Sequence, residues 1–310
     1  MNDPRKHHYI PVFYLRQWAT NGFLCEMRKV HGGKVVVHSK APDGTGYLKD
    51  LYKIDGVPQE VSQHMELKFM SMVDGHAADA LRLLKAGFTD AWPIRERDGW
   101  IRFILSLLFR NPESVNIIKL HFRSVWEEGV KHLREDYTKS RKPDDPETYD
   151  EFLQKTDPYA AAMAASNFMQ IIMNSEVVGN AVAKMKWTRI YLKHSRFDLL
   201  TSDRPIDMPL KLQDKEAYIL IPIGPKDLFI ASNDDAYLQD IKRANHSDIV
   251  RKINERVVAQ ARQFVWGRNE AALSFVKKHM ATLPDREIIT ERARQRSLEE
   301  AKGSPARKAD

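Results

Sequence analysis

The sequence predicts an α+β protein, with a mixed or antiparallel sheet built from an N-terminal hairpin and central strands and covered by a layer of long helices. Three observations support this class. Apolar and polar residues alternate near the N-terminus and again in the centre of the chain, whereas apolar residues recur at three- and four-residue spacing between these regions. The resulting order of strands, helices, strands and helices is not a regular alternation of single strands with single helices.

The first predicted elements are a short helix and a hairpin. Residues 11–18 start with a proline, which suits the first helical turn, and they place aromatic residues four apart on one face. Residues 23–30 and 34–38 alternate and flank a Gly-Gly turn, so they predict a hairpin. Residues 47–54 predict another short strand.

The long helices follow. Their apolar spacing predicts amphipathic helices over residues 65–84, 94–110, 112–133 and 159–178. The second of these runs to Arg110, and the third begins after Asn111-Pro112.

Strands return in the centre of the chain. Short apolar runs predict them at residues 187–193, 197–200, 218–221 and 228–231, followed by a helix over 245–262 and a strand over 264–266. We expect the N-terminal hairpin to join the strands of residues 187–231 in one sheet.

The domain organisation predicted from these elements is a single α+β domain over residues 1–283. Residues 284–310 are strongly charged and poor in apolar side chains, so we expect a tail that is a solvated helix or disordered. Two domains, divided near residues 140–150, are the alternative.

Composition places the chain among cytoplasmic proteins. Cys25 is the single cysteine, so no intrachain disulfide can form, and neither a secretory signal nor a run of 18 apolar residues is present. The formal net charge of +7 favours anionic partners such as nucleic acid or a phosphate-bearing ligand. Lys and Arg are interleaved with acidic residues, however, and nothing indicates the oligomeric state.

Two polar runs are the candidate sites. His7-His8-Tyr9 lies just before a helix start, where backbone N–H groups favour an anion, and a histidine there could act as a base, a metal ligand or a phosphate partner. Arg16 reaches the same place only if the chain folds back. The alternative is a partly exposed terminus with incidental histidines.

The second run, Thr201-Ser202-Asp203-Arg204-Pro205, follows an apolar segment. Polar residues at the end of a strand are often functional, and Asp203 could ligate a metal, orient a histidine or act as a base. A turn stabilised by the Ser and Asp side chains is the alternative. The sequence has no dinucleotide-binding motif and no Walker motif. A divalent metal is possible at these residues, but no metal-binding motif predicts one.

The opening His7-His8-Tyr9-Ile10-Pro11, followed by Tyr14-Leu15-Arg16, resembles that of a mostly bacterial family known as domain of unknown function 4238. Other stretches resemble it too: Glu66–Leu84, Phe103–Pro112 with Arg110, and Leu199–Pro205. The resemblance extends to about Trp266. It implies no function, but it selects the same two polar runs.

The first functional hypothesis is a hydrolase or nuclease-like enzyme acting on a phosphate-bearing or nucleic-acid substrate. His7, His8 and Asp203 would be catalytic. The binding residues would be Tyr9, Arg16, Glu66, Arg110, Thr201, Ser202 and Arg204. The alternative is a non-catalytic module that binds an anion or nucleic acid, in which the His/Asp cluster is structural.

Overall fold

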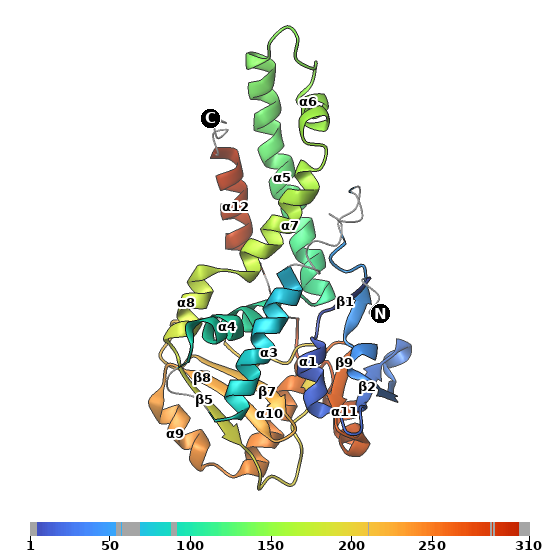
Figure 1. Cartoon of the computed structure of the whole chain (residues 1–310), viewed down its shortest axis with the longest axis vertical. Helices are drawn as coiled ribbons and strands as arrows, with labels where there is room; N and C mark the ends of the chain where they lie inside the picture. The colour runs from blue at the N-terminus through green and yellow to red at the C-terminus, as the bar shows by residue number, and fades with distance from the viewer. Residues whose placement is uncertain are drawn as a thin grey trace.

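The computed structural model describes residues 5–53, 57, 69–87, 92–209, 211–285, 287 and 289–303. It consists of a body that contains the sheets and an arm of helices that projects from it (Figure 1). The α+β class and the antiparallel pairing of the strands are confirmed. No helix in the described part of the chain is both long enough and apolar enough to cross a membrane.

A four-stranded antiparallel sheet has the order β3-β2-β9-β6. Its strands are β2 (Leu24–Lys29), β3 (Val35–Lys40), β6 (Thr201–Ser202) and β9 (Phe264–Gly267). The predicted hairpin is therefore correct, and β9 pairs with its first strand. One face of this sheet packs on the end of α10 (His246–Gln260) and on α11 (Leu273–His279).

A three-stranded antiparallel sheet has the order β5-β8-β7. It is formed by β5 (Lys186–Tyr191), β7 (Tyr218–Gly224) and β8 (Asp227–Ser232). Alternate side chains enter two cores: Phe229 packs against Trp100 of α4 (Ile94–Phe109), whereas Leu228 and Ile230 pack beneath α10. Burial on both faces explains why these strands are continuously apolar in sequence.

The expected single sheet is thus divided, because only β6 of the central region joins the hairpin. Residues 197–200 form no strand. The side-chain amide of Asn254, on α10, accepts from the Leu200 N–H at 2.8 Å and donates to the Asp198 carbonyl at 2.9 Å. A side chain therefore satisfies backbone groups that a neighbouring strand would otherwise pair.

The N-terminal segment lies across both sheets. β1 (Lys6–His8) pairs with β4 (Tyr47–Lys49), and α1 (Val12–Leu15) continues into a 3-10 turn over Arg16–Trp18. The Tyr14 hydroxyl donates to the Pro222 carbonyl at 2.7 Å, and the Trp18 indole N–H donates to the Leu199 carbonyl at 2.7 Å. These bonds anchor α1 on the body.

The helices cover the sheets and extend into the arm. Their bounds are α3 (Ser71–Lys85), α4 (Ile94–Phe109), α5 (Pro112–Ser140), α6 (Tyr149–Thr156), α7 (Ala160–Met173), α8 (Glu176–Lys184), α9 (Asp235–Arg243) and α12 (Glu291–Gly303). Short 3-10 turns occupy His31–Gly33, Pro42–Gly44 and Glu270–Ala272.

The predicted helix over 159–178 is divided into α7 and α8, because Ser175 caps a new helix. The arm contains α6, α7 and most of α5 (Figure 1). Helix α12 lies beside α5, and its side chains are exposed or half-exposed.

Candidate functional site

The two histidines of the first polar run lie on β1 and face different surroundings, because side chains alternate along a strand. His7 is fully buried, stacks on the Tyr52 ring at 5.4 Å, and accepts the Tyr52 backbone N–H at Nδ1 (2.9 Å). His8 Nε2 donates to the Asp43 carbonyl at 3.4 Å. Burial lowers the pKa of His8, the hydrogen bond to the Asp43 carbonyl opposes this change, and the charge of Arg110 adds to it, so the neutral form of the ring is favoured.

The second polar run forms β6 and the turn that follows it. Thr201 Oγ1 lies 2.8 Å from the Tyr14 hydroxyl, and Ser202 Oγ donates to the Val257 carbonyl at 2.9 Å. The Asp203 carboxylate accepts three backbone N–H groups, those of residues 262, 263 and 264, at 2.6–3.0 Å. These bonds fix the connection from α10 to β9.

Asp203 is a buried carboxylate that the backbone stabilises. Burial raises its pKa to about 6, although the three amide hydrogen bonds oppose this change. The hydrogen bonds of Asp203, His7 and His8 run to backbone groups of other segments. We predicted that a histidine contacts Asp203 in one catalytic site, and this stays a prediction. The hydrogen bonds to backbone groups favour a structural role for each of the three residues.

The remaining predicted residues are dispersed. Tyr9 is buried, and burial raises the pKa of its hydroxyl well above the usual value. Arg16 is exposed in the turn after α1. Glu66 lies outside the described residues.

Arg110 directly follows α4 as its C-cap and is fully buried. Its Nη1 donates to Asp74 at 2.8 Å, while Nε and Nη2 have no hydrogen-bond partner in the described part of the chain. Burial raises the pKa of Asp74, and Arg110 opposes that shift. Arg110 therefore joins α4 to α3, one residue before the turn that opens α5.

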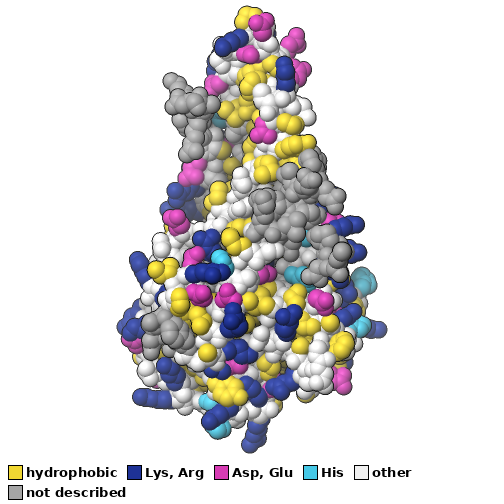
Figure 2. Space-filling view, in the orientation of Figure 1, with side chains coloured by type: hydrophobic (Ala, Val, Ile, Leu, Met, Phe, Trp, Pro, Cys, Tyr) yellow, Lys and Arg dark blue, Asp and Glu magenta, His cyan; other side chains and the backbone are white. Residues whose placement is uncertain are grey.

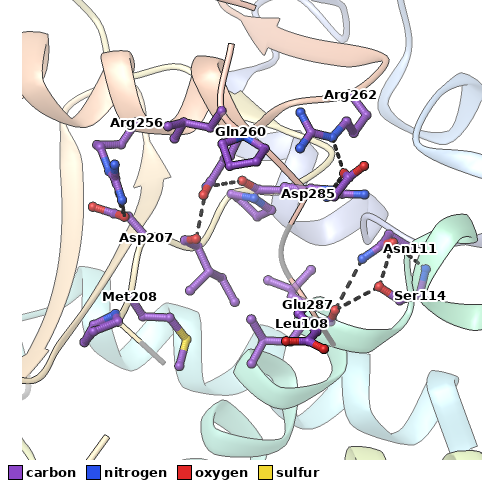
Figure 3. Close-up of a pocket in the computed structure, with 17 residues that line it drawn as sticks. Leu108, Asn111, Ser114, Asp207, Met208, Arg256, Gln260, Arg262, Asp285 and Glu287 are labelled. Atoms are coloured by element: carbon purple, nitrogen blue, oxygen red, sulfur yellow. Dashed lines mark hydrogen bonds and ion pairs between the residues drawn. The ribbon is translucent and has the colours of Figure 1, made fainter. Parts of the chain in front are cut away.

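Two sequence motifs do meet at a pocket. The turn between α4 and α5 (Asn111-Pro112) and the turn after β6 (Arg204-Pro205) border a cavity of about 380 Å³ (Figure 3). Helix α10 and four residues after α11 complete its wall, namely Leu283, Pro284, Asp285 and Glu287. The polar residues that line it are Asn111, Ser114, Arg204, Asp207, Arg256, Gln260, Arg262, Asp285 and Glu287.

The arginines of this pocket hold acidic side chains. Asp285 accepts from Arg204 Nη1 at 3.0 Å and from Arg262 Nε at 2.5 Å (Figure 3). The two side chains of these arginines are 17% and 18% exposed, whereas that of Asp285 is 75% exposed. Both arginines lower the pKa of Asp285, the hydrogen bond from Arg262 most. Two well-fixed guanidinium groups thus converge on one carboxylate oxygen.

The remaining polar groups of the pocket position the walls. Arg256 pairs with the buried Asp207 at 3.1 Å, and Gln260 Nε2 donates to the Ile206 carbonyl at 3.0 Å. Asn111 caps α5 by accepting the Ser114 N–H at 2.9 Å, so the positive end of a long helix faces the cavity.

A family model described as "Protein of unknown function (DUF4238)" matches residues 6–271. The chain belongs to this family. No curated protein matches the chain, and no solved structure matches it.

The DUF4238 match contains both predicted polar runs and most of the pocket, but it ends before Asp285 and α12. The pocket is therefore completed by residues beyond the family match. Among the described residues, no group of three or more His, Cys, Asp or Glu side chains is placed to share a metal ion.

Sequence reasoning selected Arg204 but missed Arg256, Arg262 and Asp285. Arg262 and Asp285 are 23 residues apart, and Arg204 and Asp285 are 81 apart. No local spacing joins them, because the fold of β6, α10 and the segment after α11 brings them together. The local signals of a turn here were Pro205 and the side chains of Ser202 and Asp203.

Proposed function

We propose that this DUF4238 protein is a non-catalytic binding protein for a small phosphate-bearing ligand, which occupies the pocket between β6, α5 and α10. The observation that supports the proposal is the convergence of Arg204 and Arg262 on one carboxylate oxygen of Asp285. Arginine presents several N–H donors in a planar fork, which suits phosphate as well as carboxylate. A phosphate oxygen in place of the Asp285 carboxylate would keep the same donors.

The rest of the pocket suits the two ends of such a ligand. The first turn of α5 offers a positive dipole end to an anion. Apolar side chains, including Leu107, Leu108 and Met208, line the same cavity and would contact the uncharged part of the ligand. A volume of about 380 Å³ lies within the usual range for small-molecule sites, roughly 300–1,000 Å³.

Asp285 would compete with the ligand. Its side chain is largely exposed, and exposed ion pairs are weak because water screens them. A phosphate dianion carries more charge and more acceptor oxygens than a carboxylate. Displacement of Asp285 by the ligand is therefore expected to be favourable.

Hydrolysis of a phosphate-bearing or nucleic-acid substrate, with His7, His8 and Asp203 as catalytic residues, is the alternative. It is less well supported, because Asp203 already accepts three backbone N–H groups and His7 accepts one.

A cytoplasmic location remains part of the proposal, since the sequence has a single cysteine.

The proposal is tested by calorimetric titration of the whole protein with inorganic phosphate and with glycerol phosphate. Replacement of Arg262 by Gln should weaken binding about ten- to a hundred-fold, the usual effect of losing one charge-assisted hydrogen bond. Arg251→Gln is the matched control, because Arg251 is on the same helix but pairs with Asp248 outside the pocket. Equal losses in both variants would contradict the proposed site.

The same titration examines the competition by Asp285. Asp285→Asn should bind phosphate several-fold more tightly than the wild type, since the competing charge is removed. Glu287→Gln removes one charge from the same pocket wall and should change affinity much less. A different outcome would support the enzymatic alternative. In that case neither the wild type nor any variant binds phosphate, the wild type hydrolyses a phosphodiester, and His8→Ala abolishes that activity.

A further inference from the structure

A second cavity, of about 390 Å³, lies between α5 and α7 near the end of β4. It is separate from the proposed phosphate pocket and shares no lining residue with it. Of the described residues that line it, Lys53, Lys119 and Arg123 are cationic and none is acidic. On the face of the molecule that Figure 2 shows, by contrast, basic and acidic side chains are interspersed.

Two aromatic side chains form one wall of this cavity. Phe122 and Trp126 are four residues apart on α5, so they share a helical face, and their ring centroids are 5.8 Å apart. Phe122 also contacts Phe168 of α7, at 5.6 Å, which holds its ring in place. Both are half-buried, so part of each ring is accessible to a ligand.

The opposite wall consists of small side chains. Ala161, Ala162 and Ala165 of α7 line the cavity. Their small volume leaves room between the helices beside the Trp126 and Phe122 rings. A flat, apolar-faced group is the shape that such a space accommodates.

The cations lie next to these rings. Arg123 is exposed, follows Phe122 directly on α5, and forms no ion pair with any described residue. Lys119 Nζ donates to the Leu51 carbonyl at 3.1 Å, which holds the ammonium group beside the cavity. Positive charge next to accessible aromatic rings is the combination that binds nucleotides, because bases stack on the rings while phosphates meet the cations.

We propose that this cavity binds a nucleotide, with its base against Trp126 and Phe122 and its phosphate at Arg123, Lys119 and Lys53. The same chemistry is presented by a free nucleotide and by one nucleotide of a single strand. This proposal goes beyond the phosphate pocket and does not depend on it.

Fluorescence anisotropy of the full-length protein tests it, with two labelled probes: an adenosine triphosphate analogue and a twelve-residue oligothymidylate. We expect saturable binding of at least one probe. Arg123→Gln should weaken probe binding several-fold. For the oligonucleotide, the slope of log affinity against log salt concentration should become shallower by about 0.7, because one phosphate contact is lost. Trp126→Leu keeps an apolar side chain but removes the stacking surface, so it should weaken binding about ten-fold or more.

Lys139→Gln is the control, because it removes the same charge from an exposed position farther along α5. It should leave binding nearly unchanged. If only the adenosine triphosphate analogue binds, the ligand is a free nucleotide. If the oligonucleotide binds as well, the cavity also accepts a nucleotide of a single strand, and either result supports the proposal. It is overturned if neither probe binds, if Lys139→Gln weakens binding as much as Arg123→Gln, or if Trp126→Leu, folded by its melting curve, binds as the wild type does.

Discussion

At the scale of single residues, the polar side chains in the two sequence motifs mainly organise the backbone. Thr201, Ser202 and Asp203 each have a hydrogen-bond partner far away in the sequence, and His7 accepts the N–H of Tyr52. A buried polar group is expensive unless it is hydrogen-bonded, and these bonds satisfy that requirement. Their residue types alone could not distinguish such a role from catalysis, because the same donors and acceptors serve both.

Asp203 gives a prediction about pH. Its pKa is raised to about 6 in the folded protein, above the value of about 3.9 expected in the unfolded chain. The stability that its proton contributes is present below pH 3.9 and is lost as pH rises through about 6. A shift of this size corresponds to about 3 kcal/mol. The difference in unfolding free energy between the wild type and Asp203→Asn should therefore shrink between pH 4 and 6.5.

Urea unfolding of both proteins at several pH values measures this difference. The Asn side chain cannot accept three N–H groups in the same way, so the variant is expected to be less stable at pH 4. A difference that grows as pH rises would show that the three amide bonds outweigh burial, and that the carboxylate is already ionised at low pH.

At the scale of elements, the spacing of apolar residues predicted the helices and strands that local sequence determines. The helices α4 and α10 and the hairpin β2–β3 follow the predicted ranges closely, because an amphipathic face or a Gly-Gly turn specifies them. The division of the strands into two sheets was not predictable in this way. The division depends on which neighbouring strand each strand pairs with in the folded chain. For residues 197–200 it also depends on the Asn254 side chain, which hydrogen-bonds their backbone in place of a strand.

Two truncations separate the contributions of the C-terminal segment to stability. Truncation after Thr290 removes α12, whose described side chains are exposed or half-exposed, so it should cost less than about 1 kcal/mol. Truncation after Leu283 also removes Ile289, which packs against the main core, and the Asp285 ion pairs. That further loss should be about 1–2 kcal/mol.

Thermal unfolding of the two truncated chains separates these contributions. An equal melting temperature for both would mean that the segment 284–290 adds no stability. A large drop on removal of α12 alone would mean that its contact with α5 contributes more than the exposure of its side chains indicates.

At the scale of the whole molecule, the arm and the body differ in how much they bury. In α6 no residue is buried, and in α5 none is buried beyond Val130. In β8, by contrast, every residue is buried, and in β7 every residue except Tyr218. Local opening has a free energy that follows the buried contacts it disrupts, so the tip of the arm should open independently of the body.

Contacts around Tyr137 hold the tip of the arm. Its ring is 5.3 Å from that of Phe152 on α6, and its hydroxyl donates to the Pro146 carbonyl at 2.8 Å. In native-state hydrogen exchange, amides of residues 149–156 should exchange well before those of β7 and β8. Tyr137→Ala should accelerate exchange in α6 without affecting β7 and β8, whereas Tyr137→Phe, which removes only the hydroxyl bond, should have a smaller effect. Equal acceleration in α6 and the strands would show that the arm and the body unfold as one cooperative unit.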